Sequence, residues 1–158
     1  MPDNRTNERT NDTTTESDQP NTAPPPPGKP LAGYRVIELA IWVAGPAVGG
    51  LMADWGADVI KVEAPTGDPQ RAMFAAVGID KDLPNPPFAQ DNRGKRSVVL
   101  DLQSDEGKRS FEELLETADV FVTNLRVKAL ERLGLTPAGV SRRHPNLVVA
   151  TQSGYGPT

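Results

Sequence analysis

The sequence has no cysteine and only one histidine among its 158 residues. Without cysteine there can be no disulfide, no cysteine-ligated zinc or iron–sulfur centre and no thiol nucleophile. A single histidine excludes a metal site built from several histidines of one chain. The 17 Lys+Arg and 21 Asp+Glu residues give a formal charge of −4, so the chain also lacks the basic excess typical of nucleic-acid-binding proteins.

Long apolar runs are missing as well. No segment approaches the roughly 20 apolar residues of a membrane-spanning helix. The N-terminus has no apolar core of the kind found in signal peptides. We therefore expect a cytoplasmic protein that uses no metal and binds neither nucleic acid nor membrane.

Composition changes sharply near residue 30. Residues 1–29 carry only Met1 and Ala23 as apolar side chains and end in a run of four prolines at positions 24–27. Such a segment cannot bury enough apolar surface to offset the entropy of ordering it. We predict a disordered, polar and proline-rich tail over residues 1–29, followed by one domain over residues 30–158.

The domain alternates between short β-branched runs and segments of helical periodicity. The expected strands cover residues 34–39, 58–63, 97–102, 119–123 and 146–151. Helices are expected from residue 45, weakly over 70–77, after the cap residue Ser104, and over 128–133 and 137–143. A strand, helix and second strand within about 30 residues form a βαβ unit, so the sequence predicts an α/β fold with parallel strands. Residues 64–96 are expected to be largely irregular.

Several residue groups have two possible interpretations. In the expected first helix, Ala47, Val48, Leu51, Met52 and Trp55 fall on one face. The loop at residues 43–47 before it is either an anion site at a helix start or a tight turn.

The cations at Arg93, Lys95 and Arg96, and those at Arg126, Lys128 and Arg132, either meet a phosphate or are simply solvated. His144 is either a catalytic base or a cation at a helix end. No dinucleotide or P-loop motif is present. The residues alone therefore predict a nucleotide-binding type of domain without identifiable chemistry.

Seven segments together resemble the class III CoA-transferase family, which includes formyl-CoA transferase, carnitine CoA-transferase and α-methylacyl-CoA racemase. The resemblance covers residues 30–158. The segments are Pro30-Leu31-Ala32-Gly33-Tyr34-Arg35-Val36-Ile37-Glu38-Leu39, Ala44-Gly45-Pro46, Leu51-Met52-Ala53-Asp54-Trp55-Gly56-Ala57-Asp58-Val59-Ile60-Lys61-Val62-Glu63, Asn92-Arg93-Gly94-Lys95-Arg96-Ser97, Asp119-Val120 with Asn124-Leu125-Arg126, Leu130-Glu131-Arg132-Leu133-Gly134-Leu135, and Ser153-Gly154-Tyr155-Gly156.

This resemblance implies a Rossmann-like parallel sheet that binds coenzyme A, in a homodimer of interlocked chains. The family's transferases move CoA between an acyl-CoA and a carboxylic acid through an aspartyl-CoA intermediate, which is covalent carboxylate catalysis. The racemase branch instead moves an α-proton. In the family the catalytic aspartate follows the Ser-Gly-Tyr-Gly loop, so we expect a truncated domain without a catalytic residue and without turnover. The alternatives are a racemase-like enzyme, or a non-catalytic fragment that binds CoA or pairs with another subunit.

The resemblance also implies which residues contact CoA. Loop residues 43–44 would meet the nucleotide, residues 100–103 the adenine and ribose, Arg132 a phosphate, and residues 153–156 the pantetheine arm. The full set is Val43, Ala44, Leu100, Asp101, Leu102, Gln103, Asn124, Leu125, Arg126, Arg132, Ser153, Gly154, Tyr155 and Gly156. Ala64 and Gln103 stand where many or some members carry a cation, so positive charge near CoA is expected to be lower. As a further departure, Val127-Lys128 replaces a frequent Pro-Gly.

Overall fold

The computed structural model describes residues 27–80 and 83–156. Its elements in chain order are β1 (Arg35–Leu39), α1 (Ala44–Asp54), β2 (Asp58–Glu63), the 3-10 helix η1 (Pro69–Ala72), α2 (Met73–Ala76), α3 (Pro86–Asp91), β3 (Arg96–Val99), α4 (Asp105–Glu116), β4 (Val120–Thr123), α5 (Val127–Leu133), α6 (Pro137–Arg143) and β5 (Val148–Thr151). The predicted α/β class and all five predicted strands are confirmed. The predicted tail over residues 1–29 lies almost entirely outside the described residues.

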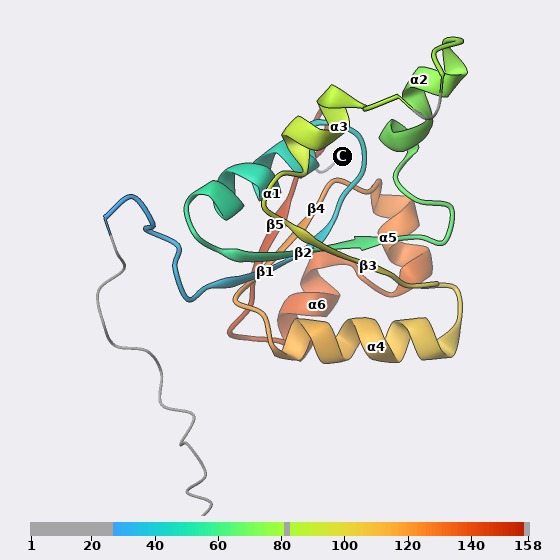
Figure 1. Ribbon diagram of the computed structural model, residues 1–158. Helices are drawn as coiled ribbons and strands as arrows, with labels where there is room; N and C mark the ends of the chain where they lie inside the picture. Colours follow the sequence, from blue (N-terminus) through green and yellow to red (C-terminus); the bar gives the residue numbers. More distant parts are fainter. Residues whose placement is uncertain (1–26, 81–82, 157–158) are drawn as a thin grey trace, which may run out of the picture.

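The five strands form one sheet in the order β3-β2-β1-β4-β5, and every neighbouring pair is parallel. In this order β1 is central, and the chain winds outward first through β2 and β3 and then, on the other side, through β4 and β5 (Figure 1). The winding reverses between β1 and β4. Open parallel sheets bind ligands outside the carboxyl ends of the strands at such a reversal.

The main core lies on the face of the sheet that α4, α5 and α6 cover (Figure 1). Ile37 and Phe121 of neighbouring strands are fully buried there, and Phe111 of α4 meets Phe121 edge to face with ring centroids 5.7 Å apart. The alternation of side chains along a strand sends Glu38 and Lys61 to the other face, below α1. One face of the sheet is therefore apolar, and the other carries buried charge.

Helix α1 packs on the sheet through small residues. Gly45, Pro46, Gly49 and Gly50 are its buried positions, whereas Val48, Leu51 and Trp55 are exposed. The shared apolar face expected from the sequence therefore points largely outward. The cause lies below Gly49, where a Cβ atom would stand only 1.9 Å from Glu38 Oε2.

Two elements differ from the sequence prediction. Strand β3 ends at Val99 rather than at residue 102, because Asp101 Oδ1 accepts the Gln103 backbone N–H at 2.9 Å and turns the chain. Helix α3 falls within the segment expected to be irregular. Asn85 caps it by accepting the Phe88 backbone N–H at 3.0 Å, and Pro86 and Pro87 occupy its first turn, where no N–H is required. None of the helices in the described ranges is long and apolar enough to cross a membrane.

Candidate functional site

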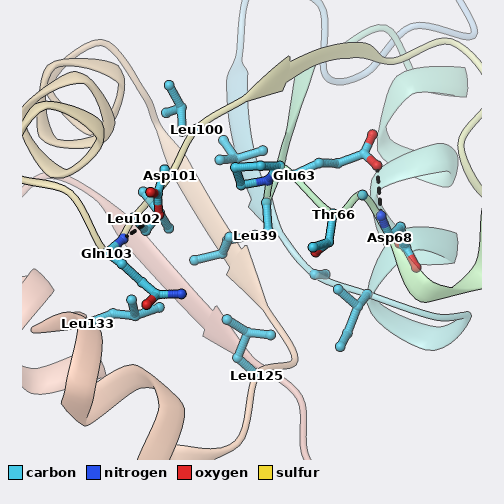
Figure 2. A pocket seen from close by; sticks show the side chains of 16 residues that line it. Leu39, Glu63, Thr66, Asp68, Leu100, Asp101, Leu102, Gln103, Leu125 and Leu133 are labelled. Atoms are coloured by element: carbon cyan, nitrogen blue, oxygen red, sulfur yellow. Dashed lines mark hydrogen bonds between the residues drawn. The ribbon is translucent and has the colours of Figure 1, made fainter.

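A cavity of about 410 Å³ opens at the carboxyl edge of the sheet, at the reversal between β1 and β4. The ends of β1 and β2, the segments that follow β2, β3 and β4, and one residue of α5 surround it (Figure 2). Its lining residues are Leu39, Ala40, Ile41, Val62, Glu63, Ala64, Pro65, Thr66, Gly67, Asp68, Leu100, Asp101, Leu102, Gln103, Leu125 and Leu133.

The lining is mostly aliphatic, with polar groups gathered at its two ends. In Figure 2, Asp101 and Gln103 stand at one end, and Glu63 and Asp68 stand at the other. The lining contains no lysine or arginine. An aliphatic slot with a few polar groups suits a flat, uncharged ring whose edge forms hydrogen bonds.

A second hollow of about 460 Å³ adjoins this cavity and shares Leu102, Gln103 and Leu133 with it. Lys108 of α4 and Arg132 of α5 also line the second hollow. Neither cation forms an ion pair with a carboxylate of residues 27–80 or 83–156. Two such cations beside an aliphatic slot suit a ligand that joins a ring to a phosphate.

Behind the β1 end of the cavity lies a buried charge cluster formed by Glu38, Lys61, Asp68 and Lys95. Lys61 Nζ stands 3.1 Å from Glu38 Oε1 and 2.9 Å from Asp68 Oδ2, and Lys95 Nζ stands 2.7 Å from Glu38 Oε2. All four side chains are at most 2% exposed. Burial raises the pKa of Glu38 above its usual value, an effect that Lys95 and Lys61 oppose. Burial likewise lowers the pKa of Lys95, against the attraction of Glu38.

Glu63, at the end of β2, is fully engaged by its neighbours. It accepts two hydrogen bonds from Arg71, at 2.8 and 2.7 Å, one from the Ser97 hydroxyl at 2.8 Å and one from the Asp68 backbone N–H at 3.0 Å. These bonds, with those from Arg71 strongest, lower the pKa of Glu63 to about 2. Glu63 is therefore a structural anion that fixes the loop after β2.

The structure brings only some of the predicted contact residues together. Leu100, Asp101, Leu102, Gln103 and Leu125 line the cavity, and Arg132 lines the adjoining hollow. The start of α1 leaves Val43 and Ala44 exposed, and Arg126 is exposed at the start of α5.

Asn124 contacts the β1–α1 loop. Its Oδ1 accepts the Ile41 backbone N–H at 2.9 Å, and its Nδ2 donates to the Ile41 carbonyl at 2.7 Å. The segment after β5 forms a turn of its own, in which the Ser153 hydroxyl bonds to the backbone of Gly156. Tyr155 is 99% exposed, and none of residues 153–156 lines the cavity.

The cations at Arg93, Lys95 and Arg96 and the residue His144 have internal roles. Arg93 pairs with Asp54, Arg96 pairs with Asp58 at 2.6 Å, and Lys95 belongs to the buried charge cluster, so none of these three cations faces the cavity. His144 ends α6, and its Nε2 stands 2.7 Å from Glu112 Oε2 of α4. It is a helix-end residue joined to a neighbouring helix.

Sequence reasoning missed the wall formed by residues 63–68 and the cation Lys108. It also missed the buried charge cluster, although a signal was present. Glu38 and Lys61 interrupt the apolar runs at residues 36–39 and 59–62, and they occupy paired positions in the register of β1 and β2. Within the described ranges, no cluster of three histidine, aspartate or glutamate residues could hold a metal ion.

The doubly wound parallel sheet, with a cavity where its winding reverses, defines a Rossmann-like α/β protein of the nucleotide-binding type. Residues 31–158 match the family CoA-transferase family III. The chain belongs to this family, as the segments quoted above predicted.

Curated relatives include the probable fatty acyl-CoA transferase Rv3272 of Mycobacterium tuberculosis, which is 42% identical over 82% of this chain and 33% of its own length. The cinnamoyl-CoA:phenyllactate CoA-transferase of Clostridium sporogenes is 41% identical over 80% of this chain and 31% of its own. The crystal structure of Rv3272 in an orthorhombic form superposes with a TM-score of 0.70 and 39% identity, covering 84% of this chain and 36% of that one. The chain thus spans about a third of the length of these relatives.

Proposed function

We propose that this chain binds the nucleotide end of coenzyme A and forms the CoA-binding part of an enzyme that transfers CoA between carboxylic acids. One observation carries the first half of the proposal. The aliphatic cavity at the reversal of the sheet adjoins a hollow with two cations that have no described carboxylate partner. Family membership and the printed names of the relatives support the second half.

Each part of the nucleotide has a matching group. The adenine ring lies among Leu100, Leu102 and Leu133, and Asp101 accepts a hydrogen bond from a ribose hydroxyl. Arg132 and Lys108 neutralise the phosphate charge. They compensate for positions 64 and 103, where this chain has Ala64 and Gln103 instead of the cations found in other members. The 14 residues that the family resemblance implies as CoA contacts remain predictions. Those that line the two hollows should be tested first.

The acyl-transfer step needs a carboxylate that attacks the thioester carbonyl and releases the CoA thiolate, forming a mixed anhydride. The thiolate then attacks the carbonyl of the enzyme's own carboxyl group, which forms a thioester between the enzyme and CoA and releases the donor acid. Three aspartates in or near the segments shared with the family, Asp54, Asp58 and Asp101, already have structural roles. Asp58 pairs with Arg35 and Arg96, and Asp54 pairs with Arg93. Asp101 turns the chain after β3. We assign none of them to catalysis and expect no turnover from residues 1–158 alone.

A second candidate function is a non-catalytic module that binds CoA or pairs with another subunit. The exposed apolar side of α1, formed by Val48, Leu51 and Trp55, favours it. The names of the relatives favour a transferase over the racemase branch. On the resemblance alone, we further propose an interlocked homodimer in the cytoplasm, acting on an acyl-CoA and a carboxylic acid, with residues 1–29 as a separate tail.

Titration calorimetry with CoA, dephospho-CoA and pantetheine tests the binding proposal. We expect saturable binding of CoA and none of pantetheine, because the proposed contacts lie at the nucleotide end. Absence of saturable CoA binding at millimolar concentration would overturn the proposal. Binding of pantetheine as tight as that of CoA would move the ligand away from the two hollows described here.

A further inference from the structure

The loop between β1 and α1 forms one wall of the cavity through Ala40 and Ile41. The next residue, Trp42, has a φ of 65°, and in the described part of the chain it is the one non-glycine residue with positive φ. A bulky side chain is sterically disfavoured in this left-handed region of backbone conformation. Contacts from outside the loop must therefore hold this conformation.

Three side chains from other segments fasten consecutive loop residues. Lys61 Nζ of β2 donates to the Ala40 carbonyl at 2.8 Å. Asn124, after β4, bonds to both the N–H and the carbonyl of Ile41. Asp68 Oδ1, after β2, accepts the Trp42 backbone N–H at 3.1 Å. The strained loop thus has side-chain partners at three residues in succession.

Asp68 connects this loop to the neighbouring wall of the cavity, formed by residues 63–68. It lies at the end of the 63–68 segment, its own N–H donates to Glu63 Oε2 at 3.0 Å, and its Oδ1 also accepts the Gln70 N–H at 2.9 Å. Its Oδ2 stands 2.9 Å from Lys61 Nζ, with both side chains at most 2% exposed. Asp68 therefore joins the wall after β2 to the β1–α1 loop through the Trp42 N–H, and Lys61 holds both Asp68 and the Ala40 carbonyl of that loop.

A buried ion pair is weak evidence for stability, because the cost of desolvating two charges offsets most of their attraction. Its clearest effect is geometric, since Lys61 holds one oxygen of Asp68 while the other oxygen accepts the Trp42 N–H of the β1–α1 loop. We propose that Asp68, held by Lys61, is a positioning residue that keeps the β1–α1 loop in the conformation competent to bind CoA. This inference rests on the proposed function.

The test uses the two tryptophans of the sequence. In a Trp55→Phe background, Trp42 becomes a single fluorescent reporter of the loop. The main variant is Asp68→Ala, which removes both the acceptor for the Trp42 N–H and the partner of Lys61. The conservative variant is Asp68→Asn, which keeps an acceptor oxygen and removes the charge. The control for general destabilisation is Val140→Ala, which truncates a fully buried side chain of α6 that lines neither hollow.

We expect Asp68→Ala to raise the Kd for CoA about ten-fold, the result if the loop holds its competent conformation in about a tenth of the molecules. Trp42 fluorescence anisotropy should fall in the same variant, and Asp68→Asn should give intermediate values. Val140→Ala should lower the thermal midpoint while leaving the Kd and the anisotropy unchanged.

The outcomes separate the two proposals. If the Trp55→Phe parent does not bind CoA, the proposed function fails and this inference fails with it. If the parent binds CoA and Asp68→Ala binds it equally well, with unchanged anisotropy, only the positioning role is overturned. Should Asp68→Ala fail to fold, Asp68→Asn decides, because a Kd and an anisotropy equal to those of the parent would overturn the role.

Discussion

At the scale of single residues, Lys108 and Arg132 are the charges on which the phosphate contact depends. Each should contribute about 1.4 kcal/mol, so we expect Lys108→Ala and Arg132→Ala each to raise the Kd for CoA about ten-fold. If the two cations hold the 3′-phosphate, both losses should disappear with dephospho-CoA, which lacks that group. Calorimetric titration of each of the two variants with CoA and with dephospho-CoA, beside the parent, measures these Kd values directly.

The matched control is Lys128→Ala, which removes an exposed cation of α5 that lines neither hollow. Its Kd should stay within about two-fold of the parent at moderate ionic strength, because distant surface charges are screened. Equal losses in all three variants would indicate attraction to the general charge of the protein rather than a phosphate contact at the hollow.

Asn124 and Lys61 illustrate how far single residues can be predicted. The resemblance marked Asn124 as a CoA contact, but its amide is used on the backbone of Ile41, 83 positions earlier. That partner depends on how β4 aligns with β1, which no local pattern encodes. Lys61 is the reverse case, because its buried partner was not predicted although a lysine between Ile60 and Val62 was a visible signal for one. Residues 100–103 were also marked by the resemblance, and all four line the cavity, which agrees with ligand binding beyond the carboxyl ends of parallel strands.

At the scale of elements, the close packing of α1 on the sheet depends on Gly49. A Cβ atom there would lie 1.9 Å from Glu38 Oε2 and 3.1 Å from Lys95 Cε. We expect Gly49→Ala to destabilise the protein by about 3 kcal/mol, since the helix must move away from a buried ion pair that cannot shift easily. Urea unfolding measures the loss.

Gly154→Ala is the control, because nothing lies within 4 Å of its added Cβ atom. We expect this change to alter stability by less than about 0.5 kcal/mol. If Gly49→Ala were equally neutral, the helix would not be confined by the charges below it.

The elements that were predicted well are those with strong periodicity. Ser104 before Asp105 and Glu106, followed by Phe111 and Leu115 on one face, predicted α4, and its cap is confirmed by the bond from Gly107 N to Ser104 Oγ at 3.0 Å. The orientation of α1 could not be predicted in the same way. Its large apolar residues lie outward because glycines are needed above the charged face of the sheet, and the burial of that charge depends on tertiary packing.

At the scale of the whole molecule, the response to acid follows from carboxylates that the fold stabilises in their charged form. Glu63, with a pKa of about 2, has the largest such effect, and the pKa values of Asp58 and Glu112 are also lowered. The native state then binds fewer protons than the unfolded state, so stability is fully present above the unfolded pKa and falls as the pH drops from about 4.5 toward 2. The raised pKa of Glu38 acts in the opposite direction.

Replacing Glu63 by glutamine should remove most of this dependence. We expect Glu63→Gln to lower the free energy of unfolding by about 2 kcal/mol at pH 7, with the difference from the parent narrowing steadily below about pH 4.5. Urea unfolding at a series of pH values measures the difference. Glu131→Gln, which changes an exposed carboxylate of α5, serves as the control. A difference that stayed constant down to pH 3 would contradict the role given to Glu63.

The strand order also has a consequence for folding kinetics. Strand β1 pairs with β2 across one short crossover, but its pairing with β4 joins Val36 to Val120 and requires closing a loop more than three times as long. The entropy of loop closure rises with loop length, so the β1–α1–β2 unit can assemble early and the β1–β4 contact forms late. The cavity lies where β1 meets β4, and Leu125 and Leu133 of its lining follow β4. The lining is therefore complete only after this late contact has formed.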